Sequence, residues 1–275
     1  MATPAWEYAW LRSAVFGLSL CAWLAVLWPV LAGQEAGAEH LAISYCGAPV
    51  PVPSFATYAP SGELLASVTP LSPGLTWAWA GNWALMLVAM MLPTLVAPLC
   101  HVHSRSFARR RARAMSLFVL GYGAVWLVVG SGLLGLQRLV QGWFANPYLL
   151  AGAAVLLALV WQASPLKQRF LNRGHRHRAL AAFGVRADAD ALRLGLEHGG
   201  WCAASCWALM LVPPLLPSGH LWAMAAVGLL MYCERLDPPG QPAWRWRGFK
   251  TAVGFARLRL LGPRRFLHTE LVSMR

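Results

Sequence analysis

The stretch LEHGGWCAASCWALM, residues Leu196 to Met210, places four possible ligands of a soft metal ion within one predicted helix. On a helix, residues four positions apart stack along one side with a drift of about 40° per step. The residues that follow this spacing, called the ladder below, are His198, Cys202, Cys206 and Met210. An imidazole, two thiols and a thioether suit an ion such as Cu(I). Cys and Met also pack well inside helices, so a purely structural role for the ladder stays open.

The composition of the whole chain is that of an integral membrane protein. Of its 275 residues, 58% are hydrophobic, 12% are charged and 15 are Trp, a balance that soluble globular domains do not show. The formal net charge is +13, but the basic residues cluster beside long apolar runs, and this pattern orients a membrane protein. We therefore expect a lipid bilayer, and no nucleic acid, as a partner.

The apolar runs predict an all-α, polytopic transmembrane helix bundle of about six spans, since a span needs roughly 20 apolar residues. The expected spans are Ala14–Ala32, Leu75–Cys100, Met115–Leu136, Tyr148–Trp161 with its flanks, the ladder helix up to Pro213, and Leu215–Cys233. Pro93, in the second run, removes a backbone donor and crowds the carbonyl of Ala89, which predicts a kink there. Inside a membrane the freed carbonyl must find another partner.

The distribution of basic residues predicts how the spans are oriented. Of the 23 Lys and Arg residues, only Arg138 lies in a proposed outer segment, and the positive-inside rule places the others in the cytoplasm. The segment Gly33–Pro73 contains no Lys or Arg and is expected outside. Both termini are then cytoplasmic. Val30-Leu31-Ala32 also fits a signal-peptidase site, so cleavage of the first run stays open.

The chain is predicted to form one transmembrane domain, residues 1–243, which includes the external loop at about 33–73. A basic tail follows at residues 244–275 and mixes Trp and Phe with Arg and Lys. This composition is typical of a segment that lies on anionic lipid. A solvated cytoplasmic tail would have the same composition.

Two methionines of the second span are predicted to complete a soft-metal site with the ladder. Met86 and Met90 are about one helical turn apart, and the second and fifth spans run antiparallel. Counting along both spans places these methionines at about the depth of Cys202 and Cys206. Met is also a common gap-filling residue in tight bundles. The acidic residue Glu234 lies at a predicted inner boundary, and we interpret it as an interfacial residue.

Three blocks of the sequence resemble a bacterial family of integral membrane proteins that are predicted to bind metal and have no assigned function. The blocks are AMMLP (Ala89–Pro93), WQASPLK (Trp161–Lys167) and the segment from GLEHGGWCAASCWALM through MYCER (Gly195–Arg235). The resemblance implies a multi-pass bundle in the bacterial cytoplasmic membrane whose Cys, Met and His residues bind a metal. After Lys167, where the family often carries a pair of cysteines, this chain has Phe170 and the Gly174-His175 region.

Two hypotheses for the function follow. In the first, the protein binds Cu(I) and transfers or transports it to a recipient protein, with the ligands Cys202, Cys206, Met210, His198, Met86 and Met90. In the second, it is a non-catalytic accessory or assembly subunit of a membrane complex, and its Cys and Met residues only pack the bundle. The sequence shows no nucleotide-binding loop and no serine triad, so an enzymatic role is not favoured.

Overall fold

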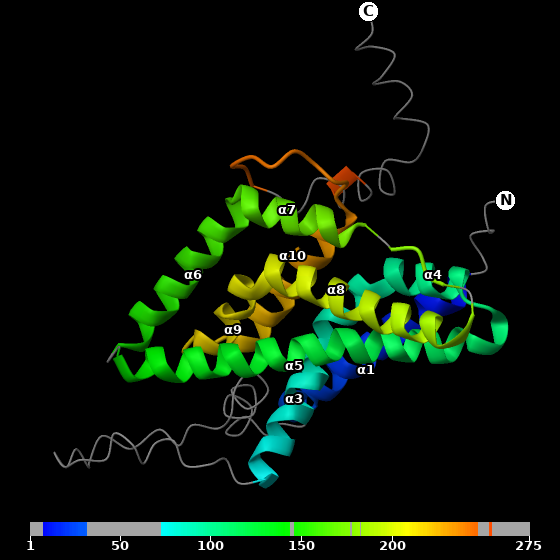
Figure 1. The fold of residues 1–275 in the computed structure, drawn as a ribbon. Helices are drawn as coiled ribbons and strands as arrows, with labels where there is room; N and C mark the ends of the chain where they lie inside the picture. The colour runs from blue at the N-terminus through cyan, green and yellow to red at the C-terminus, as the bar shows by residue number, and fades with distance from the viewer. Residues whose placement is uncertain are drawn as a thin grey trace, which may run out of the picture.

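The computed structural model describes residues 8–31, 73–143, 146–176, 178–181, 183–246 and 253–254. These residues form a bundle of helices without any strand (Figure 1). In chain order the elements are α1 (Ala9–Leu31), α3 (Pro73–Met91), η3 (Leu92–Leu95), α4 (Val96–Arg105), η4 (Ala108–Arg110), α5 (Arg111–Trp143), α6 (Pro147–Ala163), α7 (Pro165–Gly174), α8 (Gly184–Met210), α9 (Val212–Leu215) and α10 (His220–Leu236). The predicted all-α class is therefore confirmed.

Helices α5 and α8 form the most extensive helix pair and lie side by side (Figure 1). Glycine allows the two backbones to approach closely. A Cβ atom at Gly195 of α8 would lie 2.1 Å from the carbonyl oxygen of Phe118 in α5. Helix α8 also contacts α6, α7, α9 and α10. The ladder is therefore carried by the helix at the centre of the bundle.

The predicted break at Pro93 is present as a change of helix type. Helix α3 ends at Met91, and Leu92–Leu95 form the 3-10 turn η3 before α4 begins. The carbonyl of Ala89, which cannot receive a helical bond from Pro93, accepts a hydrogen bond of 2.7 Å from the hydroxyl of Ser19 in α1. The expectation that this carbonyl finds another partner is confirmed, and the bond ties α1 to α3.

Three helical stretches of the described residues are long and apolar enough to cross a membrane: Ala9–Trp28, Ala80–Arg105 and Ala108–Gln137. A fourth crossing results if α6 and α7, which meet at a bend of 67°, count as one span. The expected number of about six spans is not supported. The first half of α8 carries several charged side chains, and α10 has only 17 residues, fewer than the roughly 20 that a bilayer core requires.

Two regions of the sequence interpretation lie mostly outside the described residues. They are the expected external loop, about 33–73, and the basic tail, residues 244–275. Of the tail, Trp244 and Trp246 are described, and they expose 68% and 63% of their surface. The orientation of the chain and the division into a membrane domain and a tail therefore stay predictions.

Candidate metal centre

The ladder of α8 is buried along its whole length. Each of its four residues exposes 4% of its surface or less: His198, Cys202, Cys206 and Met210. The ring of Tyr122 in α5 has its centroid 6.1 Å from that of His198. The hydroxyl of Tyr122 lies 3.4 Å from Sγ of Cys202. Helix α5 therefore covers the first half of the ladder with an aromatic side chain.

Cys202 and Cys206 line one small cavity of about 10 Å³, called the thiol chamber below. Met91 from the end of α3 and Met231 from α10 also line it. Segments that are far apart in the sequence thus bring two thiols and two thioethers to one place. The volume is close to that of a single water-sized sphere, so the chamber has room for one small ion.

The backbone of α8 fixes the thiol of Cys206. Its Sγ lies 3.0 Å from the carbonyl oxygen of Cys202, and the hydroxyl of Ser205 donates to the same oxygen at 2.7 Å. These are bonds from a side chain back to the preceding helical turn. They hold the Cys206 sulfur on the side of α8 that faces the chamber.

A buried ion pair lies beside the two cysteines. Nζ of Lys167 in α7 is 2.7 Å from the carboxylate of Glu234 in α10, and the side chains expose 0% and 3% of their surface. The amide of Gln162 accepts from Lys167 and donates to Glu234. Each charge therefore has a partner, as a buried ion pair requires. Glu234 is buried, because α10 turns its carboxylate inward to Lys167, and its position at a membrane boundary stays a prediction.

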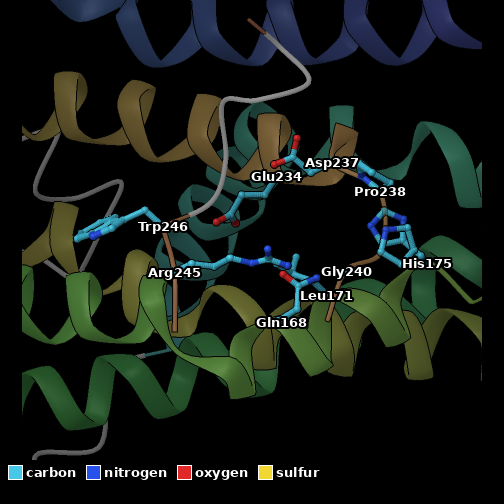
Figure 2. Close-up of a pocket in the computed structure, with 10 residues that line it drawn as sticks. Gln168, Leu171, His175, Glu234, Asp237, Pro238, Gly240, Arg245 and Trp246 are labelled. Atoms are coloured by element: carbon cyan, nitrogen blue, oxygen red, sulfur yellow. The ribbon is translucent and has the colours of Figure 1, made fainter. Parts of the chain in front are cut away.

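An open pocket of about 410 Å³ shares part of its lining with the thiol chamber, and Figure 2 shows the residues that line this pocket. His175 at the end of α7 and Arg245 in the segment after α10 line it. Two wall residues, Leu171 and Glu234, are common to the pocket and the chamber. These two side chains therefore form the part of the wall that the chamber shares with the open pocket.

Asn172 of α7 holds Gly240, which lines the open pocket, in place. Its side chain accepts from the backbone N–H of Gly240 at 3.1 Å and donates to the Gly240 carbonyl at 2.7 Å. Another residue of the pocket wall is His175. Its burial, and to a smaller extent the positive charge of Arg235, lower the pKa of its imidazole below the usual value. The imidazole is therefore neutral at pH 7, the form in which it can bind a metal ion.

The sequence model of one known family matches this part of the chain. It is the PpoB2 family, described as a copper chaperone, and the match covers residues 80–256, which is more than half of the chain. The chain belongs to the PpoB2 copper chaperone family. No curated protein and no solved structure matches it significantly. The region matched by PpoB2 includes Met91, Cys202, Cys206 and Met231. The expectation of a metal-related family is thus confirmed, and the family's metal is copper.

The donor atoms of the thiol chamber fit the copper assignment of PpoB2. Within the described ranges, no group of three or more His, Cys, Asp and Glu side chains could hold a metal ion. Structural zinc sites use four such ligands, and the chamber does not supply them. It supplies two thiols and two thioethers, the soft donors that favour Cu(I).

The structure brings only part of the predicted ligand set together. Met86 and Met90 are both buried, but neither lines the thiol chamber. Met90 instead borders a cavity of about 290 Å³ between α3, α1 and α10. Met91 lines the chamber because neighbouring residues on a helix point about 100° apart.

The two ends of the ladder lie beyond the chamber. His198 and Met210 are each one helical turn from the nearest cysteine, and neither lines the cavity. Their predicted role as ligands therefore stays a prediction. The structure places them as the next side chains along the same face of α8.

Several residues of the site were missed from the sequence, although two blocks quoted above contained a signal for them. WQASPLK contains Lys167, and MYCER contains Met231, Glu234 and Arg235. A Lys and a Glu next to apolar runs are expected to pair with each other if both are buried, because such residues are rarely buried without a partner. Nothing in the sequence pointed to Tyr122.

Proposed function

We propose that this protein binds one Cu(I) ion in the thiol chamber and transfers it to a recipient protein. Cys202 and Cys206 act as thiolate ligands, and the thioethers of Met91 and Met231 lie next to them. The proposal rests on one observation: both thiols line a single buried cavity within the region that matches the copper chaperone family. Burial also keeps the thiolates away from oxidants, because oxidation of cysteine follows its exposure.

The open pocket supports transfer to a recipient in preference to permanent storage. Only Leu171 and Glu234 are common to the pocket and the chamber. Glu234 is fixed by its ion pair with Lys167, so we expect a change of side-chain conformation at Leu171 to open the path. His175 in the pocket wall is neutral and can bind the ion on its way. A cysteine or methionine of a recipient protein can reach the same pocket from outside.

We place this process in the bacterial cytoplasmic membrane. Helices α1 and α5 expose large apolar side chains, among them Leu18, Leu120 and Val128, at 60%, 64% and 74% of their surface. Such residues suit contact with lipid. The pocket lies at the end of α7, near Arg173 and Arg245, and the positive-inside rule assigns this end of the bundle to the cytoplasm.

Metal analysis of the purified full-length chain, with copper, zinc and iron assayed under reducing conditions, tests the proposal. We expect about one copper per chain, and loss of most of it in the Cys202→Ser/Cys206→Ser double variant, because a hydroxyl is a hard donor that ionises poorly. Cys233→Ser is the matched control, since Cys233 is buried but outside the chamber. Transfer is measured as the rate at which a water-soluble Cu(I) chelator removes the copper.

Equal copper in the wild type and the double variant, or none in either, would contradict the proposal. The accessory-subunit hypothesis, in which the cysteines only pack the bundle, would then be preferred. The yield of each variant in the membrane fraction separates a loss of metal from a loss of folded protein.

A further inference from the structure

Arg235 of α10 brings a guanidinium group to the wall of the thiol chamber. Its terminal nitrogens, Nη1 and Nη2, are both buried and meet no oxygen or nitrogen acceptor among the described residues, while the side chain of Cys202 interacts with the guanidinium. Gly174 of α7 makes room for the group, because a Cβ atom there would lie 2.4 Å from Nη1. The thiols of Cys202 and Cys206 interact with it electrostatically. The guanidinium is thus held against the two cysteines without an acidic partner.

The charges around the chamber do not balance when both thiols are neutral. Lys167 and Glu234 neutralise each other. Arg235 takes part in none of the ion pairs formed by the described residues, and a guanidinium group cannot lose its proton in a protein. A buried charge without a partner is strongly unfavourable. The chamber therefore favours contents that carry one negative charge.

We propose that Arg235 is the counter-ion of a Cu(I) complex with Cys202 and Cys206, and that its charge makes the chamber prefer monovalent to divalent soft ions. This inference rests on the proposed function. When Cu(I) binds, two S–Cu bonds form, each thiol that is still protonated releases its proton to water, and no electron is transferred. Two thiolates and one Cu(I) carry a total of one negative charge, which the guanidinium neutralises.

A divalent ion in the same place leaves a charge without a partner. Two thiolates and one Zn(II) or Cd(II) sum to zero, so the positive charge of Arg235 is again uncompensated. Cd(II) is soft, as Cu(I) is, but divalent, whereas Ag(I) is both soft and monovalent. A comparison of Ag(I) with Cd(II) therefore separates the effect of charge from that of ligand softness.

Metal binding by the purified full-length chain under reducing conditions tests this inference. Cu(I) affinity is measured against a Cu(I) chelator, and Ag(I) and Cd(II) are added as competitors. In the wild type we expect Ag(I) to displace Cu(I), and Cd(II) to bind far more weakly. Arg235→Met removes the charge and should lower Cu(I) affinity by roughly tenfold to a thousandfold, the effect of one nearby opposite charge on an ionised group. Its Cd(II) affinity should be unchanged or higher.

Two further variants complete the experiment. Arg235→Lys keeps the charge and should keep most of the preference for Cu(I). Arg245→Met removes an arginine that lines the open pocket but not the chamber, and it should leave both affinities unchanged.

The remaining outcomes contradict either the counter-ion role of Arg235 or the proposed function. Equal losses of Cu(I) and Cd(II) affinity in Arg235→Met, or no loss of Cu(I) affinity, would overturn the counter-ion role and leave the proposed function intact. If Arg235→Met does not fold, the wild type still decides, since tight Cd(II) binding at Cys202 and Cys206 contradicts the charge argument. Absence of Cu(I) from these cysteines in the wild type contradicts the proposed function itself.

Discussion

Lys167 and Glu234 place two full charges in the interior of a bundle made mostly of apolar residues. Removing both ions from water is unfavourable, and their mutual attraction offsets this only when the remaining hydrogen-bonding positions are also filled. Gln162 fills positions on both partners. The pair therefore holds α7 and α10 in one arrangement around the cysteines.

Loss of one partner of this pair should destabilise the fold severely. In Glu234→Gln the buried Lys167 loses its counter-charge, and we expect a decrease in the free energy of unfolding of about 3–5 kcal/mol. Thermal unfolding of the detergent-solubilised chain, followed by tryptophan fluorescence, measures the change. Glu197→Gln is the control, because Glu197 is 40% exposed in its pairs with Arg178 and Arg193; a change of about 0–1 kcal/mol is expected there. Similar changes in both variants would contradict the account.

The methionines of the site give a second test at the scale of single residues. Met91→Leu and Met231→Leu keep the side-chain volume but remove a thioether from the chamber, so each should weaken Cu(I) binding by about tenfold, equivalent to roughly 1.4 kcal/mol. Met86→Leu and Met90→Leu should bind as the wild type does. Chelator competition measures all four variants. A larger loss of Cu(I) affinity in Met86→Leu and Met90→Leu than in the other two variants would favour Met86 and Met90, the ligands predicted from the sequence.

At the scale of elements, the sequence predicted those features that depend on local chemistry. The break at Pro93 follows from a missing N–H group, and the alignment of the ladder along one side of a single helix follows from its spacing. The choice of Met91 over Met90 could not be predicted, because it depends on how α3 is rotated about its own axis against α8 and α10. That rotation is set by packing between elements that are distant in the sequence.

The described residues support fewer spans than the expected number of about six, for a related reason. An apolar run was counted as a span wherever it was long enough with its flanks. In the structure α8 is apolar only in the half that carries the ladder. Its polar half contains Asp188, which forms ion pairs with Arg110 and Arg113 in the basic segment that is predicted to lie in the cytoplasm. The apolar half of α8 is mostly buried among the other helices.

The close contact of α5 with α8 leads to a prediction at the same scale. Gly195→Ala adds a methyl group where only 2.1 Å separates the new atom from the Phe118 carbonyl oxygen. The two backbones must move apart, and we expect a loss of stability of about 1–3 kcal/mol. Gly200→Ala is the control on the same helix: its new atom meets nothing within 4 Å, and alanine should stabilise the helix by up to about 1 kcal/mol. The prediction is confirmed if the unfolding temperature falls in Gly195→Ala and rises in Gly200→Ala. Equal shifts in the two variants contradict it.

At the scale of the whole molecule, the proposed transfer of copper depends on the side of the membrane that the open pocket faces. The positive-inside rule predicts that the C-terminus lies in the cytoplasm and that Gly33–Pro73 lies outside. Reporter fusions at His268 and Ser54 test both statements in cells. A cytoplasmic signal from the Ser54 fusion would show that the orientation is wrong, and the pocket would then face away from a cytoplasmic recipient.

The separation in sequence of the residues that surround Lys167 has a consequence for how the chain is synthesised. Gln162 and Glu234 are 72 residues apart, so α6 and α7 leave the ribosome well before the carboxylate of α10 exists. In the proposed membrane location, we expect the ammonium group of Lys167 to stay hydrated at the membrane surface during that interval, because its counter-charge is still missing. We therefore expect Lys167 to reach its buried position only after α10 has been synthesised and can supply the carboxylate of Glu234.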